Sequence, residues 1–164
     1  MRFQYAGYKK IKGEDGIIIR TFSPCAEITY SQADAEIVYR MLEESGRHFD
    51  LLGFGNVMLA QVSVGNGADY ISFTQECRAF LFRQNHKIGD IVYVIIKDKN
   101  FLPAVRRVAI DHMDKETLRV EEPNQYNGVA YDTWTFPWTA LRREVYTSKQ
   151  AACRALNKRR RKQM

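Results

Sequence analysis

One uninterrupted run of β-branched and aromatic residues constrains the fold of this chain more than any other feature. Between Ile91 and Lys97, six of the seven residues are Ile, Val or Tyr, and Lys97 is the first polar one. A strand without alternation of polar and apolar residues is typical of a sheet interior covered on both faces. We therefore predict a central strand within Lys87–Ile96, opened by a Gly-Asp turn in which Asp90 bonds to its own main chain.

The segments after this run predict further short strands that pair with it. Their β-branched residues are separated by turn signals every 8 to 12 residues or so, a spacing typical of a small barrel or sandwich. We expect a meander that closes as a small SH3-like barrel or a strongly bent sheet. Trp134, Phe136 and Trp138 are predicted to plug one end of it. The expected strands are Leu102–His112, Thr117–Glu121, Val129–Thr133 and Arg143–Tyr146.

The first thirty residues predict a β-hairpin. Arg2–Tyr8 and Gly16–Phe22 are rich in aromatic and β-branched residues, and Gly13 with Asp15-Gly16 supplies turn chemistry between them. Pro24 is expected to end the second strand.

The clearest helix is expected between Ser31 and Gly46. Ser31 can cap its start and Gly46 suits a left-handed stop. Its apolar residues return at helical spacing, so one face should lie on a sheet. These residues are Ala33, Ile37, Val38, Met41 and Leu42.

The stretch between this helix and the central run is less regular. Phe49–Asn56 is expected to be a connection, and Val57–Val64 a strand that pairs with Tyr70–Thr74 across a Gly65–Asp69 turn. Thr74–Asn85 fits either a helix, with Cys77, Phe80 and Leu81 on one side, or an alternating strand. We favour the helix because the NHKIGD sequence that follows is typical of a helix exit.

The chain is predicted to end in a basic helix. Thr147–Gln150 has the sequence of a capping box, with Thr147 as the cap. Ala151, Ala152, Ala155 and Leu156 then supply a small apolar face.

These elements predict an α+β fold in two parts. Residues 1–86 form an N-terminal α+β part, and residues 87–164 form a small β-barrel with a terminal basic helix. A chain of 164 residues can bury enough surface for a core without a metal or a disulfide. Cys25, Cys77 and Cys153 are widely spaced and odd in number, which indicates reduced thiols. With no signal-peptide pattern and no membrane-spanning apolar run, we expect a soluble cytoplasmic protein that does not bind membranes.

The net charge of +6 is concentrated at the C-terminus. Residues 142–164 hold nine Lys and Arg against one acid, so the first 141 residues sum to −2. Five consecutive cations bury nothing and repel one another, so folding does not explain them. The predicted phosphate-binding residues are Arg142, Arg143, Lys149, Arg154, Lys158, Arg159, Arg160, Arg161 and Lys162.

Nucleic-acid phosphate is the favoured ligand for this basic segment. The alternatives are contact with an acidic protein groove or an RNA-laden complex, and simple solubility. Aromatic side chains near such a patch can stack on bases, and Trp134 and Trp138 are included as candidates. Tyr126 and Tyr131 are two further aromatic candidates, although positions in the core or at the barrel end are expected for most of the aromatic residues.

No catalytic motif is present in the sequence. His48, His86 and His112 fall in separate predicted connections or strand ends and form no metal or triad spacing, so structural or surface positions are expected. Asp111–Asp114 could hold a cation, but two carboxylates beside a turn more often only interact with water. We predict no enzyme activity, no metal and no cofactor.

The C-terminal part resembles a known type of module. KIGDIVYVI, a meander and REVYTSKQAACRAL are similar to a module of small proteins from phages and other mobile elements of Gram-positive gut bacteria. There a GD-x-V-Y strand begins a small β-barrel and a VF-T-x-x-x-A helix closes it. The resemblance covers residues 87 to about 157. It implies a mobile-element origin, a setting in which small non-enzymatic proteins act on nucleic acid or inhibit host defence nucleases.

Two functions are therefore expected as alternatives. The first is an accessory protein that binds DNA, RNA or a nucleoprotein complex through the basic helix, as a monomer or a homodimer. The second is an anti-CRISPR-like protein that blocks a nuclease effector by protein contacts. An unrecognised enzyme is the third and least favoured alternative.

Overall fold

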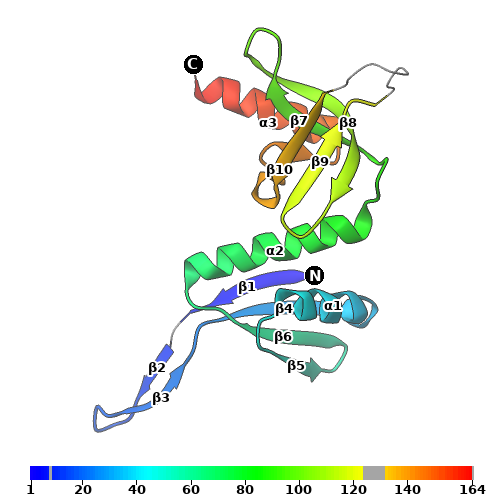
Figure 1. Ribbon diagram of the computed structural model, residues 1–164. Coiled ribbons are helices and arrows are strands. Elements are labelled where there is room, and N and C mark those ends of the chain that lie inside the picture. Colours follow the sequence, from blue (N-terminus) through cyan, green and yellow to red (C-terminus); the bar gives the residue numbers. More distant parts are fainter. Residues whose placement is uncertain (8, 124–131, 164) are drawn as a thin grey trace. The chain divides into compact units, whose positions relative to one another are not determined.

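A computed structural model describes residues 1–7, 9–123 and 132–163 of the chain (Figure 1). The described chain divides into two compact units, Met1–Cys77 (unit 1) and Arg78–Met164 (unit 2), and each is described by itself. It contains helices and antiparallel sheets, so the predicted α+β class is confirmed.

Unit 1 is built on a four-stranded antiparallel sheet in the order β1-β4-β6-β5. One face is apolar, because Ala26, Ile28 and Tyr30 of β4 alternate inward and pair with buried residues of β6. The other face is more exposed and of mixed character, with Glu27, Gln61 and Asp50 beside Leu52, Leu59 and Val57. The strands are β1 (Arg2–Ala6), β4 (Cys25–Ser31), β5 (Phe49–Phe54) and β6 (Val57–Ser63).

The hairpin predicted between the first two strands is wrong in its pairing. β1 pairs with β4, and the hairpin is instead formed by β2 (Lys9–Lys12) and β3 (Ile18–Phe22). Phe3 and Tyr5 of β1 stand opposite Ile28 and Ala26, so this register places their side chains on the apolar face. The prediction failed because the alternation of Cys25–Ser31, a complete strand after Pro24, was not recognised.

The first helix is confirmed with a different start. A 3-10 turn, η1 (Gln32–Asp34), precedes α1 (Ala35–Ser45), and the Ser31 hydroxyl contacts Asp34 at 3.3 Å and caps no main-chain N–H. Gly46 ends the helix at φ 68°, as predicted. Val38, Met41 and Leu42 are buried, and α1 contacts β4 (Figure 1).

Phe49–Asn56 is not a plain connection. Phe49–Phe54 forms β5, which pairs with β6 through a turn at Gly55, where φ is 60°.

Residues 70–74 are not a strand, because they belong to the helix α2 (Gly67–Asn85). The Asn66 side chain accepts a hydrogen bond from the Asp69 N–H at 2.9 Å, and the Asp69 carboxylate accepts one from the Gly65 N–H at 2.6 Å. This reciprocal arrangement caps a helix start, and the GNGAD sequence was mistaken for a hairpin turn.

The helix favoured for Thr74–Asn85 is confirmed as the second part of α2, but its buried side differs from the prediction. Phe73 and Cys77 are buried within unit 1, and Ala79 and Phe82 within unit 2. Phe80 and Leu81 are only half-buried. Within the described residues, no helix is both long and apolar enough to cross a membrane.

Unit 2 contains a five-stranded antiparallel sheet, curled into a half-barrel, in the order β10-β9-β8-β7-β11 (Figure 1). The predicted central strand is confirmed as β7 (Ile91–Lys97), which lies between two neighbours. Asp90 accepts a hydrogen bond from the Lys87 N–H at 3.0 Å, so the predicted turn chemistry is confirmed. The other strands are β8 (Pro103–Met113), β9 (Thr117–Glu121), β10 (Thr133–Pro137) and β11 (Val145–Tyr146).

β10 starts where the predicted strand Val129–Thr133 was expected to end. Residues 129–131 lie outside the described residues, so that prediction is tested only at its last positions. Phe136 and Trp138 belong to the buried core of unit 2, and Trp134 packs against it. A second 3-10 turn, η2 (Trp138–Ala140), leads from β10 to β11, which returns to pair with β7.

The last helix, α3 (Lys149–Lys162), contacts β7, β8 and β11. Its cap is Ser148, whose hydroxyl accepts a hydrogen bond from the Ala151 N–H at 3.2 Å, so Thr147 was the wrong choice. On β7, Val92 and Val94 enter the core cluster, whereas the buried Ile95 points to the opposite face. Both faces of the central strand are therefore covered, as predicted.

Candidate nucleic-acid interface

The buried apolar side of α3 determines which of its cations lie on the exposed side of the helix. Ala152 and Leu156 are buried, so this side of the helix is occupied by the body of unit 2. At 100° per residue, Arg154, Lys158 and Arg161 lie on the opposite side, and all three are exposed. We call these three residues the α3 stripe. They span roughly 10 Å along the helix axis and present one row of positive charge.

Helix stability accounts for only part of this charge. Arg159 to Lys162 occupy the last turn, where cations interact favourably with the partial negative charge of the helix end. Arg154 and Lys158, however, are neighbours at i and i+4, a spacing at which like charges repel by a few tenths of a kcal/mol. The stripe is thus mildly unfavourable for the helix alone.

Arg159 has a different role from its neighbours. It is half-buried, and its guanidinium donates a hydrogen bond to the Arg143 carbonyl. The Tyr146 hydroxyl donates to the same carbonyl at 2.9 Å. Arg159 therefore fastens the end of α3 to the turn before β11, a contact that no sequence pattern indicated.

Two predicted cations lie in the turn that Arg159 contacts. The N–H groups of Arg143 and Glu144 donate to the Ala140 carbonyl at 3.0 and 2.8 Å, and Arg142 adopts a left-handed conformation at φ 63°. Arg142 and Arg143 are exposed. The structure thus brings this turn to the C-terminal half of α3, as the prediction of a continuous basic surface requires.

Lys149 is separated from that end of the helix. It lies in the first turn of α3, ten residues before Arg159, which corresponds to about 15 Å along the axis. None of the ion pairs between described residues includes a cation of α3. In the described part of the chain, the α3 charges therefore remain unneutralised by acids.

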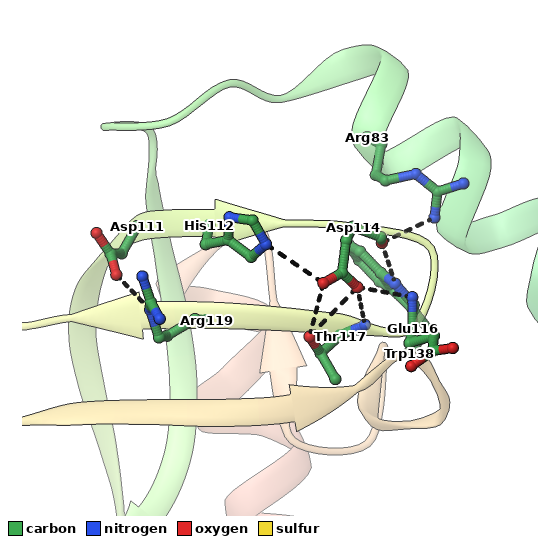
Figure 2. Close-up of polar contacts among 8 residues, drawn as sticks. All are labelled: Arg83, Asp111, His112, Asp114, Glu116, Thr117, Arg119 and Trp138. Carbon is green, nitrogen blue, oxygen red and sulfur yellow. Dashed lines mark hydrogen bonds and ion pairs between the residues drawn. The ribbon is translucent and has the colours of Figure 1, made fainter.

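The tryptophans do not complete this surface. Trp138 is 8% exposed, its ring lies 5.6 Å from that of Phe82, and its Nε1 donates to the Asp114 carbonyl at 2.8 Å (Figure 2). A ring held in this way has no free face for a base. Trp134 is half-buried, with the Arg106 guanidinium 5.3 Å from its ring centre. Tyr126 and Tyr131 lie outside the described residues.

The Asp111–Asp114 segment is used by the β8–β9 turn. Asp114 accepts hydrogen bonds from the Glu116 and Thr117 N–H groups at 2.8 and 2.7 Å (Figure 2). These main-chain donors are the chief reason that the pKa of Asp114 falls to about 2. Asp111 is paired with Arg119. Within the described residues, no group of three or more His, Cys, Asp or Glu side chains is placed to hold a metal.

The same turn is fastened to two other elements. Besides Trp138 of η2, Arg83 of α2 approaches the Asp114 carbonyl at 3.5 Å, and its guanidinium lies 5.4 Å from the Trp138 ring centre. His112 faces the Asp114 carboxylate at 3.3 Å. These contacts give the segment a structural role in holding unit 2 together.

Unit 1 contains a shallow hollow that the sequence did not predict. It measures about 360 Å³ and includes Glu27, Gln61 and Asp50, which stand side by side across β4, β6 and β5. Burial, followed by the charge of Glu27, raises the pKa of the nearby Cys25 thiol, so the thiolate needed for nucleophilic chemistry is disfavoured. The signal missed was the strand character of Phe49–Phe54, which places Asp50 in this row.

Charge separates the two units. Unit 1 has seven Lys and Arg against ten Asp and Glu, a net charge of −3, whereas unit 2 has 18 against nine, a net charge of +9. Residues 78–141 contribute only +1 of this total. The excess positive charge of unit 2 therefore comes from the β11 turn and α3.

Comparisons of the chain with protein-family models, with curated proteins and with solved structures found no match.

Proposed function

We propose that the protein binds nucleic acid, or a nucleoprotein complex, through the exposed cations of α3. The observation that carries this proposal is the division of the helix into two sides. Ala152 and Leu156 fix one side on the body, and Arg154, Lys158 and Arg161 stand on the other without acidic partners among the described residues. Phosphate groups are the ligands that such a row of cations fits best.

Under this proposal the other basic residues have graded roles. Arg142, Arg143, Arg160 and Lys162 extend the positive surface around the end of α3, Lys149 contributes at its start, and Arg159 orients the helix. Trp134 and Trp138 are left out of the proposed interface because their rings are packed against unit 2. The contacts are then mainly electrostatic, which favours binding to the phosphate backbone with little base readout.

The proposal extends to the kind of protein. The meander of β7 to β10, the η2 turn and the return of β11 to β7 support an SH3-like arrangement of unit 2 with α3 closing it. The resemblance of residues 87 to about 157 to phage and mobile-element modules supports a mobile-element accessory protein. We propose a non-enzymatic role, and the cytoplasm as its location.

A charge-matched pair of variants tests the interface. The first replaces Arg154, Lys158 and Arg161 by Gln. The control replaces three other exposed cations by Gln, so that both variants lose the same formal charge. These are Lys97 and Lys99, at the connection between β7 and β8, and Lys115, at the connection between β8 and β9. Fluorescence anisotropy with labelled duplex DNA, duplex RNA and single strands is measured at about 0.1 M salt. Losing three phosphate contacts should weaken binding about 100-fold or more in the first variant.

The control variant should weaken binding by less than about tenfold, since it changes only the long-range field. Equal losses in the two variants would contradict a defined interface on α3 and would leave only the effect of net charge. No binding by the wild-type protein to any of these nucleic acids would contradict the proposal itself.

A second candidate is an inhibitor of a host defence nuclease such as a CRISPR effector. Unit 1 favours it, because this unit is net acidic and exposes several large apolar side chains, among them Leu51, Val57 and Ile71, which a protein partner can cover. A tagged full-length chain is used to capture partners from host lysate treated with nuclease. A nuclease effector retained after digestion supports inhibition, and loss of all partners on digestion supports nucleic-acid binding.

A further inference from the structure

β5 is one of the two edge strands of the unit 1 sheet and, apart from the acidic Asp50, lacks the usual devices that prevent edges from pairing. Among the described residues its only hydrogen-bonded neighbour in the sheet is β6, and their register is unbroken from Phe49 to Phe54. Edge strands of stable monomers are usually short, bulged, or protected by Lys or Pro. β5 has six residues, FDLLGF, without a bulge, a proline or a cation.

The edges of the unit 2 sheet differ in these respects. β11 is only two residues long, and β10 ends in Pro137, which has no N–H to offer. β1, the other edge of the unit 1 sheet, has five residues and begins with the cation Arg2. β5 is therefore the edge with the least protection against pairing.

The hydrogen-bond pattern shows which groups of β5 are free to pair. The Ser63 N–H donates to the His48 carbonyl at 2.9 Å, so His48 and Ser63 form a hydrogen-bonded pair of the antiparallel ladder. Because such pairs alternate, Asp50 and Leu52 direct their main-chain groups to β6. Phe49, Leu51 and Gly53 therefore direct their N–H and C=O groups outward, away from the sheet.

Apolar side chains flank this row of outward groups. Leu51 is 43% exposed and Leu52 is 37% exposed, and they lie on opposite faces of the strand. Phe49 is half-buried, with its ring 6.1 Å from that of Tyr39 on α1, which is itself exposed. Both faces of the edge thus offer apolar surface to a partner strand.

We propose that two copies of this protein associate through β5, in antiparallel pairing about a two-fold axis at Leu51. The two four-stranded sheets then join into one. Such an interface is isologous, so it closes at the dimer.

The sequence of β5 favours this register over its neighbours. With the axis at Leu51, the outward residues Phe49 and Gly53 stand opposite each other, and the ring covers the glycine, a pairing that compensates for the missing side chain. Leu51 stands opposite its own copy.

An axis at Asp50 would place two carboxylates directly opposite each other, which is destabilising. An axis at Leu52 would pair only Leu51 with Gly53 and leave Phe49 without a partner strand. The Leu51 axis alone uses all three outward residues and separates the two copies of Asp50.

The first test measures mass against concentration. Sedimentation of the nuclease-treated full-length protein, in about 0.5 M salt to suppress nucleic-acid bridging, is followed from about 1 µM to about 1 mM, the range for a small interface. We expect a monomer–dimer equilibrium without larger species. A monomer throughout, or assembly beyond the dimer, would overturn the proposal.

A matched pair of substitutions locates the interface. Leu51→Lys places two cations opposite each other at the axis and should raise the dissociation constant about tenfold or more. Ile71→Lys makes the same change at a position that is 57% exposed on α2 of the same unit, and should leave dimerisation unchanged. Circular dichroism checks that both variants fold. Equal effects of the two substitutions would contradict pairing through β5.

Cysteine cross-linking reads the register directly. In the proposed dimer Leu51→Cys stands opposite its own copy, at a spacing that a disulfide can bridge. Leu52→Cys stands opposite Asp50 and lies diagonal to its copy. Under mild oxidation the Leu51→Cys variant should form a covalent dimer several-fold faster than Leu52→Cys and than the wild type with its three free cysteines. Preferential cross-linking of Leu52→Cys would refute this register.

Discussion

The sheets of the two units differ in how many of their faces are covered by other parts of the chain. The unit 1 sheet buries one face under apolar side chains of α1 and α2, and its other face carries the row of Glu27, Gln61 and Asp50. The unit 2 sheet is covered on both faces, since Val92 and Val94 enter one core and Ile95 faces the other side, where α3 packs. A sheet covered on one face keeps the other face free, whereas a sheet covered on both faces exposes the outer side of its covering helix.

This difference explains where each unit can bind. In unit 2 the exposed material is the outer side of α3, and that side holds the stripe of Arg154, Lys158 and Arg161. In unit 1 the exposed material includes the β5 edge and an outer sheet face on which Leu52 and Val57 stand beside the polar row. The two proposals, nucleic acid at α3 and self-association at β5, therefore rest on separate surfaces.

The largest expected loss of stability comes from a substitution on the face of the unit 2 sheet that α3 covers. Ile95→Ala removes a side chain that is 5% exposed and should lower the free energy of unfolding by about 2–5 kcal/mol. Leu59→Ala, on the half-buried outer face of β6 in unit 1, should cost about 1 kcal/mol. Urea denaturation followed by circular dichroism measures both. Similar losses would abolish the distinction between a sheet covered once and a sheet covered twice.

A smaller effect is expected at the turn that closes the unit 2 sheet. Trp138→Phe keeps a buried aromatic ring but removes the Nε1–H, so the Asp114 carbonyl loses its donor at 2.8 Å and keeps the longer contact from Arg83 at 3.5 Å. The loss should be about 1–3 kcal/mol. Thermal unfolding measures it, with Trp134→Phe as the control for loss of an indole. A larger effect at Trp134 would show that the turn contact contributes little.

Removing the capping side chain at the start of α2 or α3 should lower the free energy of unfolding by about 1 kcal/mol. Ser148→Ala removes the cap of α3 and Asn66→Ala removes the side-chain acceptor at the start of α2, and each should cost about 0.5–2 kcal/mol. Thr147→Ala should change stability by less than about 0.5 kcal/mol. A larger loss of stability in Thr147→Ala than in Ser148→Ala would contradict Ser148 as the cap and would place the start of α3 one residue earlier.

The smallest effects are those of acid on the two turn carboxylates. The pKa of Asp114 in unit 2 is lowered to about 2, and hydrogen bonding to Arg47 and then to the Gly65 N–H lowers the pKa of Asp69 in unit 1. A carboxyl with a lowered folded-state pKa contributes stability above its unfolded pKa of about 3.9, and this is lost as the pH falls through the folded value. Stability should therefore decline between about pH 4 and about pH 2, and less steeply in Asp114→Asn. An unchanged slope in that variant would contradict the role of the turn.

Sequence reasoning succeeded where a local pattern had only one outcome. The run from Ile91 to Lys97 permits little except an interior strand, and Gly46 permits little except a helix stop, so both were predicted with their bounds. Thr117–Glu121 was predicted as a strand from its β-branched residues between two turns, and Ala152 and Leu156 were predicted on the apolar face of the last helix. The curled sheet of unit 2 followed from the order of these strands.

The errors arose where two patterns competed or where contacts are long-range. Asn66 and Asp69 cap α2, but glycines at 65 and 67 made the same residues fit a hairpin turn. β1 pairs with β4 because Phe3 and Tyr5 share the apolar face with Ile28 and Ala26, and nothing local reports this. At the candidate interface the charges were predictable from sequence. The attachment of Arg159 to the Arg143 carbonyl and the burial of Trp138 were not, because both depend on tertiary packing.

The central claim, that the α3 stripe neutralises phosphates, is tested most directly by the salt dependence of duplex binding. From Arg154 onward α3 holds five exposed cations, so log K should fall with log salt at a slope of about −4 to −5 for the wild type. Glutamine at Arg154, Lys158 and Arg161 should reduce that slope to about −2, while the variant at Lys97, Lys99 and Lys115 keeps the wild-type value. Indistinguishable slopes for all three proteins would contradict the claim.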